Sequence, residues 1–260
     1  VYDLHTEAGT FVGGVGDFVL HNSDEQLLDP ANLYKYLRPN CYIGYAVNQH
    51  HISVDPPANL KKDIPVRFFR NNRGMRCIAL VHEHFELGVN RGIGADCIVL
   101  NDINIHHDGY LTESIRRGRF KRNLQLLRCD RKKYPERLLG TFLYEVRDCL
   151  HLARYAIEQA GGIVSDEARM YCDTVVKTYR DKFLASPQVW AIEGMQYYSE
   201  ALAILGQGIE VCVNIDVKRQ GAQLDGNVLK FRAFDAEEAK RIVAAKISEQ
   251  AAGLEGPYWA

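Results

Sequence analysis

Three consecutive residues, His21, Asn22 and Ser23, have the types and the order needed to break a peptide bond without a second molecule. The side-chain amide nitrogen of Asn22 can attack its own backbone carbonyl, and His21 can supply a proton to the leaving group. Ser23 carries a hydroxyl that can hold an acyl group before that cleavage. An ordinary turn is the alternative interpretation, because Asn and Ser are common turn residues.

Six of the nine histidines lie in three short clusters, at residues 49–55, 81–86 and 105–110. In a strand, His82 and His84 would project from one face while Glu83 points to the other. This pair and a His from a neighbouring strand could hold a divalent ion. Alternatively, Glu83 could act as a general base that activates a hydroxyl. A hydrogen-bonded structural role is the ordinary alternative for any single His on a strand.

Basic residues follow the third cluster directly, at the start of a predicted helix: Arg116, Arg117, Arg119, Lys121 and Arg122. Positive charge in a first helical turn opposes the helix dipole, and an anionic ligand would offset that cost. Phosphate is a natural candidate, since Arg offers a planar fork for it. A solvated basic face, partly balanced by an acidic residue in the same helix, is the alternative, and both interpretations stay open.

The elements that must position these residues change character along the chain. Aromatic and β-branched residues predict strands in 41–54, 65–70, 75–85 and 97–106, with 65–70 and 75–85 forming a hairpin. Apolar residues at helical spacing predict helices over 113–131, 134–160, 166–185 and 187–205, after a short helix at 31–38. Two further strands, 208–217 and 227–233, and a last helix, 236–252, follow.

Composition is ordinary for a globular protein, with 260 residues, 47% hydrophobic and 25% charged. A net charge of -1 predicts no general affinity for nucleic acid or membrane. Seven cysteines without a close pair indicate reduced thiols and a cytoplasmic protein. No apolar run approaches the roughly 20 residues of a membrane span, and no secretory signal is expected.

The stretch VYDLHTEAGTFVGGVGDFVLHNS resembles the C-terminal splicing motifs of an intein, a domain of the Hint fold. The resemblance implies that residues 1–4 open a strand, that Asp3 assists branch resolution and that residues 18–20 form the last strand before the scissile Asn22. Thr10 stands where many inteins carry a second His that helps the cyclisation. Because the sequence starts inside a motif, we expect the intein's N-terminal nucleophile to lie upstream.

Residues 40–161 resemble the C-terminal half of family-2 glycosyltransferases, enzymes of the GT-A fold. The resemblance rests on NQHHISVD, PVRFFRN, VHEHFE and IHHDGYL, followed by RRGRFKRNLQLLRCDRKKYPERLLG. It implies transfer of a sugar from a nucleotide-sugar donor with Mg²⁺ or Mn²⁺. The family's Asp-x-Asp metal motif belongs to the N-terminal half, and Asp102 has no second Asp at the right spacing.

The same resemblance implies roles for individual residues. Glu83 would be the acceptor base, which favours an inverting transfer. His107 would lie near the diphosphate and contact the metal. The remaining implied residues bind substrate or diphosphate: His82, Tyr110, Arg119 and Arg122.

Together these observations predict a mixed fold, α+β or α/β: a short Hint-type β segment, part of a GT-A-like mixed sheet, and a helical hairpin region. The expected domains are 1–22, 23–110, 111–206 and 207–260. We expect the C-terminal part of an intein-interrupted glycosyltransferase, which by itself neither splices fully nor transfers much sugar. Its expected partners are the missing N-terminal half, the donor and an unidentified acceptor. A self-splicing module with passive cargo, or a non-catalytic interaction protein using 136–205, are the alternatives.

Overall fold

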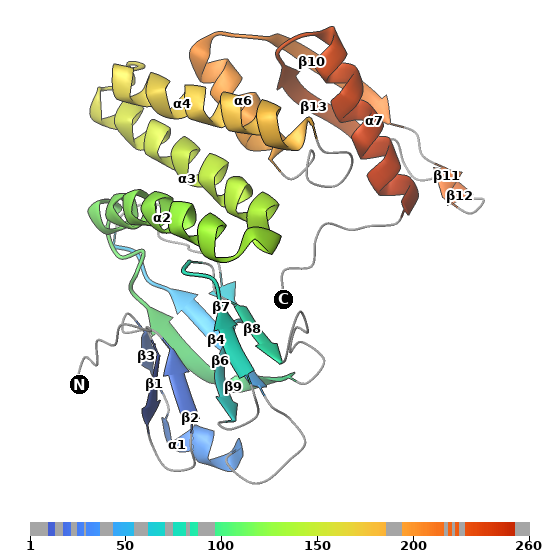
Figure 1. The fold of residues 1–260 in the computed structure, drawn as a ribbon. Coiled ribbons are helices and arrows are strands. Elements are labelled where there is room, and N and C mark those ends of the chain that lie inside the picture. Colours follow the sequence, from blue (N-terminus) through green and yellow to red (C-terminus); the bar gives the residue numbers. More distant parts are fainter. Residues whose placement is uncertain are drawn as a thin grey trace. The chain divides into compact units, whose positions relative to one another are not determined.

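The structure, a computed structural model, describes residues 10–13, 18–21, 25–28, 30–36, 44–54, 62–70, 75–81, 84–87, 97–185, 194–215, 218–219, 222–223 and 227–252. The chain separates into two compact units, residues 1–118 and residues 119–259. Strands dominate the first unit and helices the second (Figure 1). The chain therefore has the mixed α+β character that the sequence predicts.

The first unit is built on a seven-stranded mixed sheet of order β1-β2-β6-β4-β9-β3, with β5 also paired to β4 (Figure 1). Only β4 and β9 run parallel among the pairs described; the others are antiparallel. The strands are β1 (Thr10–Gly13), β2 (Phe18–His21), β3 (Glu25–Leu27), β4 (Gly44–His51), β5 (Lys62–Asp63), β6 (Val66–Arg70) and β9 (Cys97–His107).

The core of this unit surrounds β4, whose first six residues are all buried. Such a continuous buried run is typical of a central strand covered on both faces. Tyr45 and Val47 pack with Phe68 of β6 and with Leu100 and Ile103 of β9. Burying each such side chain contributes roughly 1.5–3 kcal/mol to the free energy of folding. The hydrophobic core therefore holds β4 and β9 together at residues that precede their carboxyl ends.

The predicted hairpin between residues 65–70 and 75–85 is wrong. Strand β6 lies between β2 and β4, so both of its edges already carry hydrogen-bonded neighbours. Strand β7 (Met75–Ile78) pairs instead with β8 (His84–Leu87). The single strand expected over 75–85 is also interrupted after Ile78, where Ala79 has a φ of 87°, a left-handed conformation that ends a strand.

The short helix expected at 31–38 appears as α1 (Pro30–Leu33) followed by η1 (Tyr34–Tyr36). The strands expected in residues 1–22 are described in part. β1 and β2 pair with each other, and β2 also pairs with β6, so they belong to the same sheet as the strands after Ser23. The strand expected at residues 1–4 lies outside the described residues.

The helical elements follow the predicted pattern closely. They are α2 (Glu113–Lys133), η3 (Pro135–Arg137), α3 (Leu138–Gln159), α4 (Asp166–Thr178), the π-helical turn η4 (Tyr179–Phe183), α6 (Met195–Leu205) and α7 (Ala236–Ala252). Gly161 and Gly162, with φ of 68° and 91°, follow the end of α3. Ser165 caps α4 by accepting a hydrogen bond from the backbone N–H of Ala168 at 3.2 Å.

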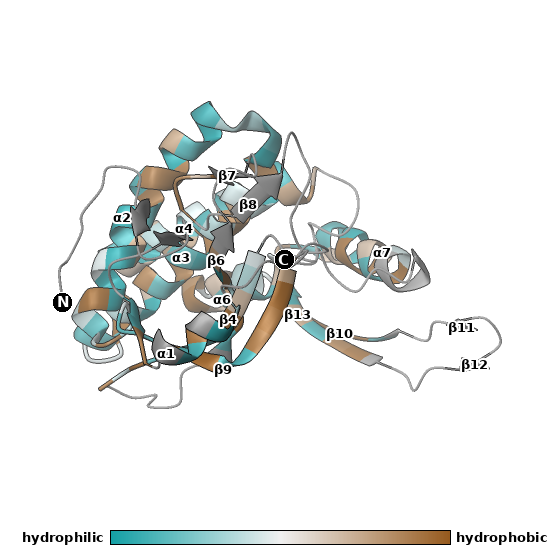
Figure 2. Cartoon of the chain, turned by 90° about the horizontal axis from the view of Figure 1, so that it is seen from below, coloured by the Kyte–Doolittle hydropathy of each residue, from teal (hydrophilic) through white to brown (hydrophobic). Residues whose placement is uncertain are grey.

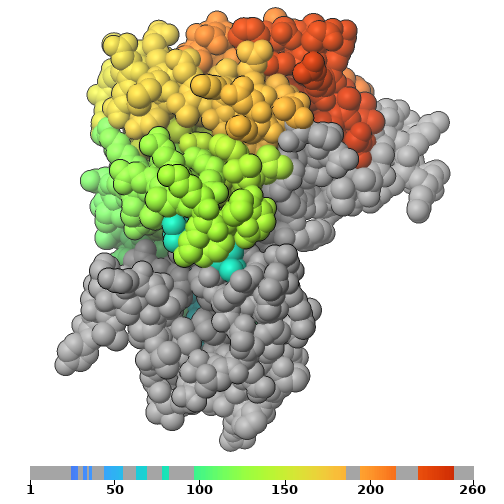
Figure 3. Space-filling model, in the orientation of Figure 1, coloured from blue at the N-terminus to red at the C-terminus, as the bar shows by residue number. Residues whose placement is uncertain are grey.

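A β-hairpin completes the second unit. Strands β10 (Ile209–Ile215) and β13 (Asn227–Ala233), both expected as strands, pair antiparallel, and the short β11 (Lys218–Arg219) pairs with β12 (Ala222–Gln223). Helix α7 presents both hydrophilic and hydrophobic residues (Figure 2), and its Ile242 is fully buried. Helices α4 and α6 lie side by side on the face seen in Figure 3.

The core of the second unit gathers residues from α3, α4, η4, α6, β13 and α7. Its largest fully buried side chains are Tyr179, Phe183, Leu150, Tyr198, Leu202 and Ile242. The rings of Tyr179 and Tyr198 stack with centroids 4.3 Å apart. Among the residues placed by the structure, no helix is both long enough and apolar enough to span a bilayer.

Candidate functional site

Two of the three histidine clusters meet at the carboxyl ends of β4 and β9. The parallel register pairs His50 with His106 and His51 with His107. The Nδ1 atoms of His51 and His107 lie 2.7 Å apart, which is hydrogen-bonding distance. Because sites in α/β sheets gather at the carboxyl edges of parallel strands, this pair marks the candidate functional site.

A carboxylate extends the histidine pair on the β5 side. Strand β5 pairs with β4 through Gln49 and Asp63, and this places the Asp63 Oδ2 atom 2.9 Å from Nε2 of His51. The His51 side chain is 8% exposed and that of Asp63 is 39% exposed. Sequence patterns do not point to Asp63, since only the pairing of β5 with β4 brings it to His51.

Tyr110 covers the two histidines. Its ring lies edge-on to His51 and His107, with centroids 5.0 and 5.4 Å away. The Tyr110 backbone carbonyl accepts a hydrogen bond from Nη1 of Arg116 at 2.8 Å, and the same nitrogen donates to Ser53 Oγ at 3.0 Å. The structure therefore brings residues 49–54 and 105–110 together, and Arg116 ties their ends.

Other members of these clusters have structural contacts. Gln49 donates to Oε1 of Glu25 at 2.6 Å, and Nε of Arg67 donates to both carboxylate oxygens of Glu25 at 2.7 and 2.8 Å. This largely buried ion pair shares one N–H between two carboxylate oxygens, and together with Gln49 it joins β3, β4 and β6. His50 Nε2 contacts Oδ1 of Asn104 at 2.9 Å. These residues hold the sheet together at the base of the site.

Asp102 is held on the outside of the sheet. The Tyr36 hydroxyl donates to its Oδ1 atom at 2.6 Å, and Lys35 lies 3.5 Å from Oδ2. The hydrogen bond from Tyr36 lowers the pKa of the Asp102 carboxyl, and Lys35 adds to this effect. Asp102 therefore anchors η1 to β9.

The basic residues at the start of α2 differ in their surroundings. Arg116 is buried and serves the turn at Tyr110, so it is not available to an anion. Arg119 and Arg122 lie in the second unit and, three residues apart on α2, share one face of that helix. Arg122 is exposed and its Nη2 atom lies 3.5 Å from Oδ1 of Asn123. Lys121 pairs with Glu167 at 3.5 Å.

A buried carboxyl of α3, which sequence inspection missed, lies near this basic face. Arg147 donates to Oδ1 of Asp148 at 2.7 and 2.9 Å, and no described residue hydrogen-bonds its buried Oδ2 atom. Burial raises the pKa of Asp148, whereas the charges of Arg147 and Arg119 oppose that rise. The nearby positive charges therefore offset part of the cost of burying this carboxyl.

Several predicted site residues lie outside the described residues: Asp3, Asn22, Ser23, His82 and Glu83. His84 is placed only as the first residue of β8. His21 ends β2, and its backbone is directly opposite Thr10 of β1. The expected face shared by His82 and His84 therefore stays a prediction.

The resemblance implies that this site binds a divalent ion. Among the described residues, no group of three or more His, Cys, Asp or Glu side chains is arranged to hold a metal ion. His107 fits as one ligand, because a neutral imidazole nitrogen binds divalent metals and its Nδ1 atom lies 2.7 Å from Nδ1 of His51, which can orient the ring. Any further ligands would have to come from elsewhere.

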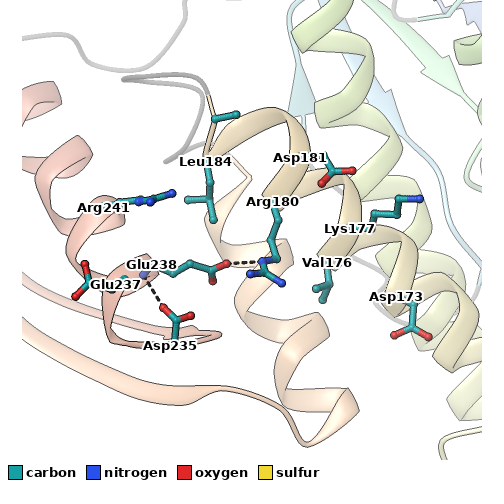
Figure 4. A pocket seen from close by; sticks show the side chains of 11 residues that line it. Asp173, Val176, Lys177, Arg180, Asp181, Leu184, Asp235, Glu237, Glu238 and Arg241 are labelled. Carbon is teal, nitrogen blue, oxygen red and sulfur yellow. Dashed lines mark hydrogen bonds and ion pairs between the residues drawn. The ribbon is translucent and has the colours of Figure 1, made fainter.

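The second unit contains a pocket of about 640 Å³ between α4, η4 and α7 (Figure 4). Acidic and basic side chains both line it, around the apolar Val176 and Leu184. Buried Glu238 holds its wall together, accepting hydrogen bonds from Nε of Arg180 and from the Tyr198 hydroxyl. Burial, and then the hydrogen bond to Glu238, raise the pKa of the Tyr198 hydroxyl. No sequence pattern pointed to this pocket, because its residues come from segments far apart in the chain.

Neither the family models nor the curated proteins give a match to this chain. A fold by itself does not determine a function. The features that bear on function are therefore the chemistry of the histidine site and the basic face of α2.

Proposed function

We propose that the residues after Ser23 form the C-terminal part of a glycosyltransferase, which transfers a sugar from a nucleotide-sugar to an acceptor. The observation that carries this proposal is the meeting of His51, His107 and Tyr110 at the carboxyl edge of the parallel pair β4 and β9. Ligands of open α/β sheets bind at this edge. The His-x-Gly-Tyr order of residues 107–110, on which the resemblance rests, lies at the same place.

In the proposed reaction, the acceptor hydroxyl attacks the sugar carbon that carries the diphosphate, and the bond to the diphosphate breaks. Glu83 would take the proton from that hydroxyl as general base, which corresponds to an inverting transfer, and His82 would contact the substrate. Arg119 and Arg122 would stabilise the negative charge of the departing nucleoside diphosphate. Arg119 and Arg122 are three residues apart on α2 and so share one face of that helix, which suits contact with a single anionic group.

His107 would contribute one ligand to Mg²⁺ or Mn²⁺, and Tyr110 would shield it from water. A bound divalent ion would supply further stabilisation of the negative charge on the diphosphate. The remaining ligands would be phosphate oxygens and the Asp-x-Asp motif of a preceding nucleotide-binding half, which the resemblance implies. The described residues contain no complete metal-binding group, so the proposal requires these further ligands.

The test uses the chain joined to its upstream half. Release of nucleoside diphosphate is measured over a panel of nucleotide-sugars with Mn²⁺. Replacement of Glu83 by Gln should lower kcat by at least about 100-fold, the usual contribution of a general base. Asp102→Asn, a carboxylate change on the outside of β9, is the control and should retain activity. Unchanged turnover in Glu83→Gln would favour a non-catalytic interaction protein, for which the pocket beside α7 is the candidate surface.

We further propose that Asn22 cyclises and thereby releases the segment that precedes Ser23. The supporting observation is the β1–β2 pairing, which brings the chain into an extended strand that ends at His21, one residue before Asn22. The Asn22 side-chain nitrogen forms a bond to its own carbonyl carbon, the bond to Ser23 breaks, and the Ser23 nitrogen takes the proton. The masses of the two products therefore sum to that of the parent chain.

Mass spectrometry of the chain mixed with the matching N-terminal intein half tests this step. We expect a product that ends in a succinimide at residue 22 and a ligated product that resumes at Ser23. Asn22→Ala is the control and should leave the junction intact. A ligated product without glycosyl transfer would support a self-splicing module with passive cargo.

The proposal also places the protein in the cytoplasm. Its support is the state of the described cysteines, which are free thiols: Cys97, Cys129, Cys149, Cys172 and Cys212. Thiols are kept reduced in the cytosol. Burial raises the pKa of Cys149 to about 12 and that of Cys172 to about 11, so these two thiols stay protonated and unreactive.

A further inference from the structure

We propose that Asp63 and His51 are positioning residues, which hold His107 in one tautomer with its proton on Nδ1 and its lone pair on Nε2. The contacts that carry this inference are the 2.9 Å contact between Asp63 Oδ2 and His51 Nε2 and the 2.7 Å contact between the two Nδ1 atoms. The use of His107 as a metal ligand rests on the function proposed above, whereas its tautomer does not.

The direction of each hydrogen bond follows from the chemistry of the groups. An ionised carboxylate only accepts hydrogen bonds, so Nε2 of His51 must carry the proton that faces Asp63. Nδ1 of a neutral His51 then has a lone pair and accepts. The contact between the two histidines needs one donor, which must be Nδ1–H of His107. In neutral His107 the other nitrogen, Nε2, therefore has the lone pair.

Backbone pairing keeps the three groups in this order. Strand β5 sets Asp63 against β4, and the parallel register sets His51 against His107. The backbone N–H of Ile52 donates to the carbonyl of His107 at 2.9 Å, which prolongs this register. With only 8% of the His51 side chain exposed, water competes poorly for its ring nitrogens. The orientation of His107 is thus fixed before any ligand binds.

The tautomer decides what His107 can do. A lone pair on Nε2 can bind a divalent cation or take up a proton. The same nitrogen cannot donate a hydrogen bond to a phosphate oxygen while the ring is neutral. The Asp63–His51 pair therefore favours contact of His107 with the metal over direct contact with the diphosphate.

Long-range ¹H–¹⁵N NMR of the full chain, labelled with ¹⁵N-histidine, reads the proton position on each ring nitrogen. His107 is assigned by the signals that disappear in His107→Gln. We expect His107 to carry its proton on Nδ1 and His51 on Nε2. A proton on Nε2 of His107, or protons on both nitrogens of His51, would overturn the inference whether or not the chain has transferase activity.

Asp63→Ala should convert both rings to averaged tautomers, because Nε2 of His51 loses its acceptor. Asp63→Asn retains a carbonyl oxygen at the same position and should preserve the pattern of the unaltered chain. Asp102→Asn is the matched carboxylate control and should change neither ring. Ring signals in Asp63→Ala identical to those of the unaltered chain would also overturn the inference.

Titration with Mn²⁺ in the same spectra separates this inference from the proposed function. With a nucleoside diphosphate added to supply phosphate ligands, we expect Mn²⁺ to broaden the His107 signals in the unaltered chain, and about tenfold more Mn²⁺ to be needed in Asp63→Ala, as for other residues that orient a ligand. The expected tautomer without broadening would support the positioning role and count against the metal role of His107.

Discussion

At the scale of single residues, Arg116 is a charged side chain beside the candidate site that has a structural role. Its guanidinium is buried and donates to Ser53 Oγ and to the Tyr110 carbonyl. The contact joins the end of β4 to the turn that carries Tyr110. Arg116 therefore acts on the site through the placement of Tyr110, whereas Arg122 of the same helix is exposed.

Arg116→Ala should lower the free energy of unfolding by about 2–3 kcal/mol, because a charged donor to two acceptors is lost from a buried position. Chemical denaturation followed by circular dichroism measures the change. Arg128→Ala, at an exposed position of α2, is the matched control and should change stability by less than about 0.5 kcal/mol. Equal effects of the two substitutions would contradict a structural role for Arg116.

At the scale of elements, the packing of α2 against α3 explains the lowered pKa of His151. The His151 ring of α3 stacks on Phe120 of α2, with centroids 4.8 Å apart and planes within 8°. Burial lowers the pKa of His151 to about 4, helped by the positive charges of Arg154 and Arg147 and opposed by Glu200. The α2–α3 contact thus requires a neutral imidazole.

His151 should make the second unit less stable in acid. Because the unfolded chain binds a proton at the ordinary pKa of 6.5 and the folded chain only near 4, stability is lost as pH falls between these values. The loss should be on the order of 2 kcal/mol, and His151→Phe, which keeps a stacked ring, should remove it. Urea denaturation at pH 7 and pH 4.5 measures the difference. An equal loss in His151→Phe would assign the acid sensitivity to other groups.

At the scale of the molecule, the described residues form two separate hydrophobic cores, one in each compact unit. Leu100 of β9 is 1% exposed in the first core, and Leu202 of α6 is 0% exposed in the second. Domains with their own cores open and unfold as units. Local damage should therefore stay within one unit.

Leu202→Ala should destabilise the second unit by about 2–5 kcal/mol, the usual result of a large-to-small change in a core. Hydrogen exchange should then quicken in α3, α4 and α6, while the amides of β4 and β9 keep their rates. Leu100→Ala is the reciprocal variant and should reverse the pattern. A uniform increase in exchange across both units would show that the chain unfolds as one cooperative body.

The sequence determines whether a segment forms a helix or a strand better than it determines which strands pair with each other. Periodicity predicted α2, α3 and α7 and the two strands β10 and β13, because helical spacing and alternation are local properties of neighbouring residues. The pairing of β6 was predicted wrongly, since a turn between two strands does not exclude other partners for either edge. Strand partners depend on contacts between distant segments, which short-range patterns do not contain.

The candidate site divides in the same way. From residue types alone, the clusters at 49–55 and 105–110 and the basic start of α2 could be recognised. Only the tertiary structure brought His51 to His107 across 56 positions of sequence, added Asp63 to the pair and buried Arg116. The reason is physical: residue type sets which chemistry is available, whereas strand register and burial decide which side chains meet and in which protonation form.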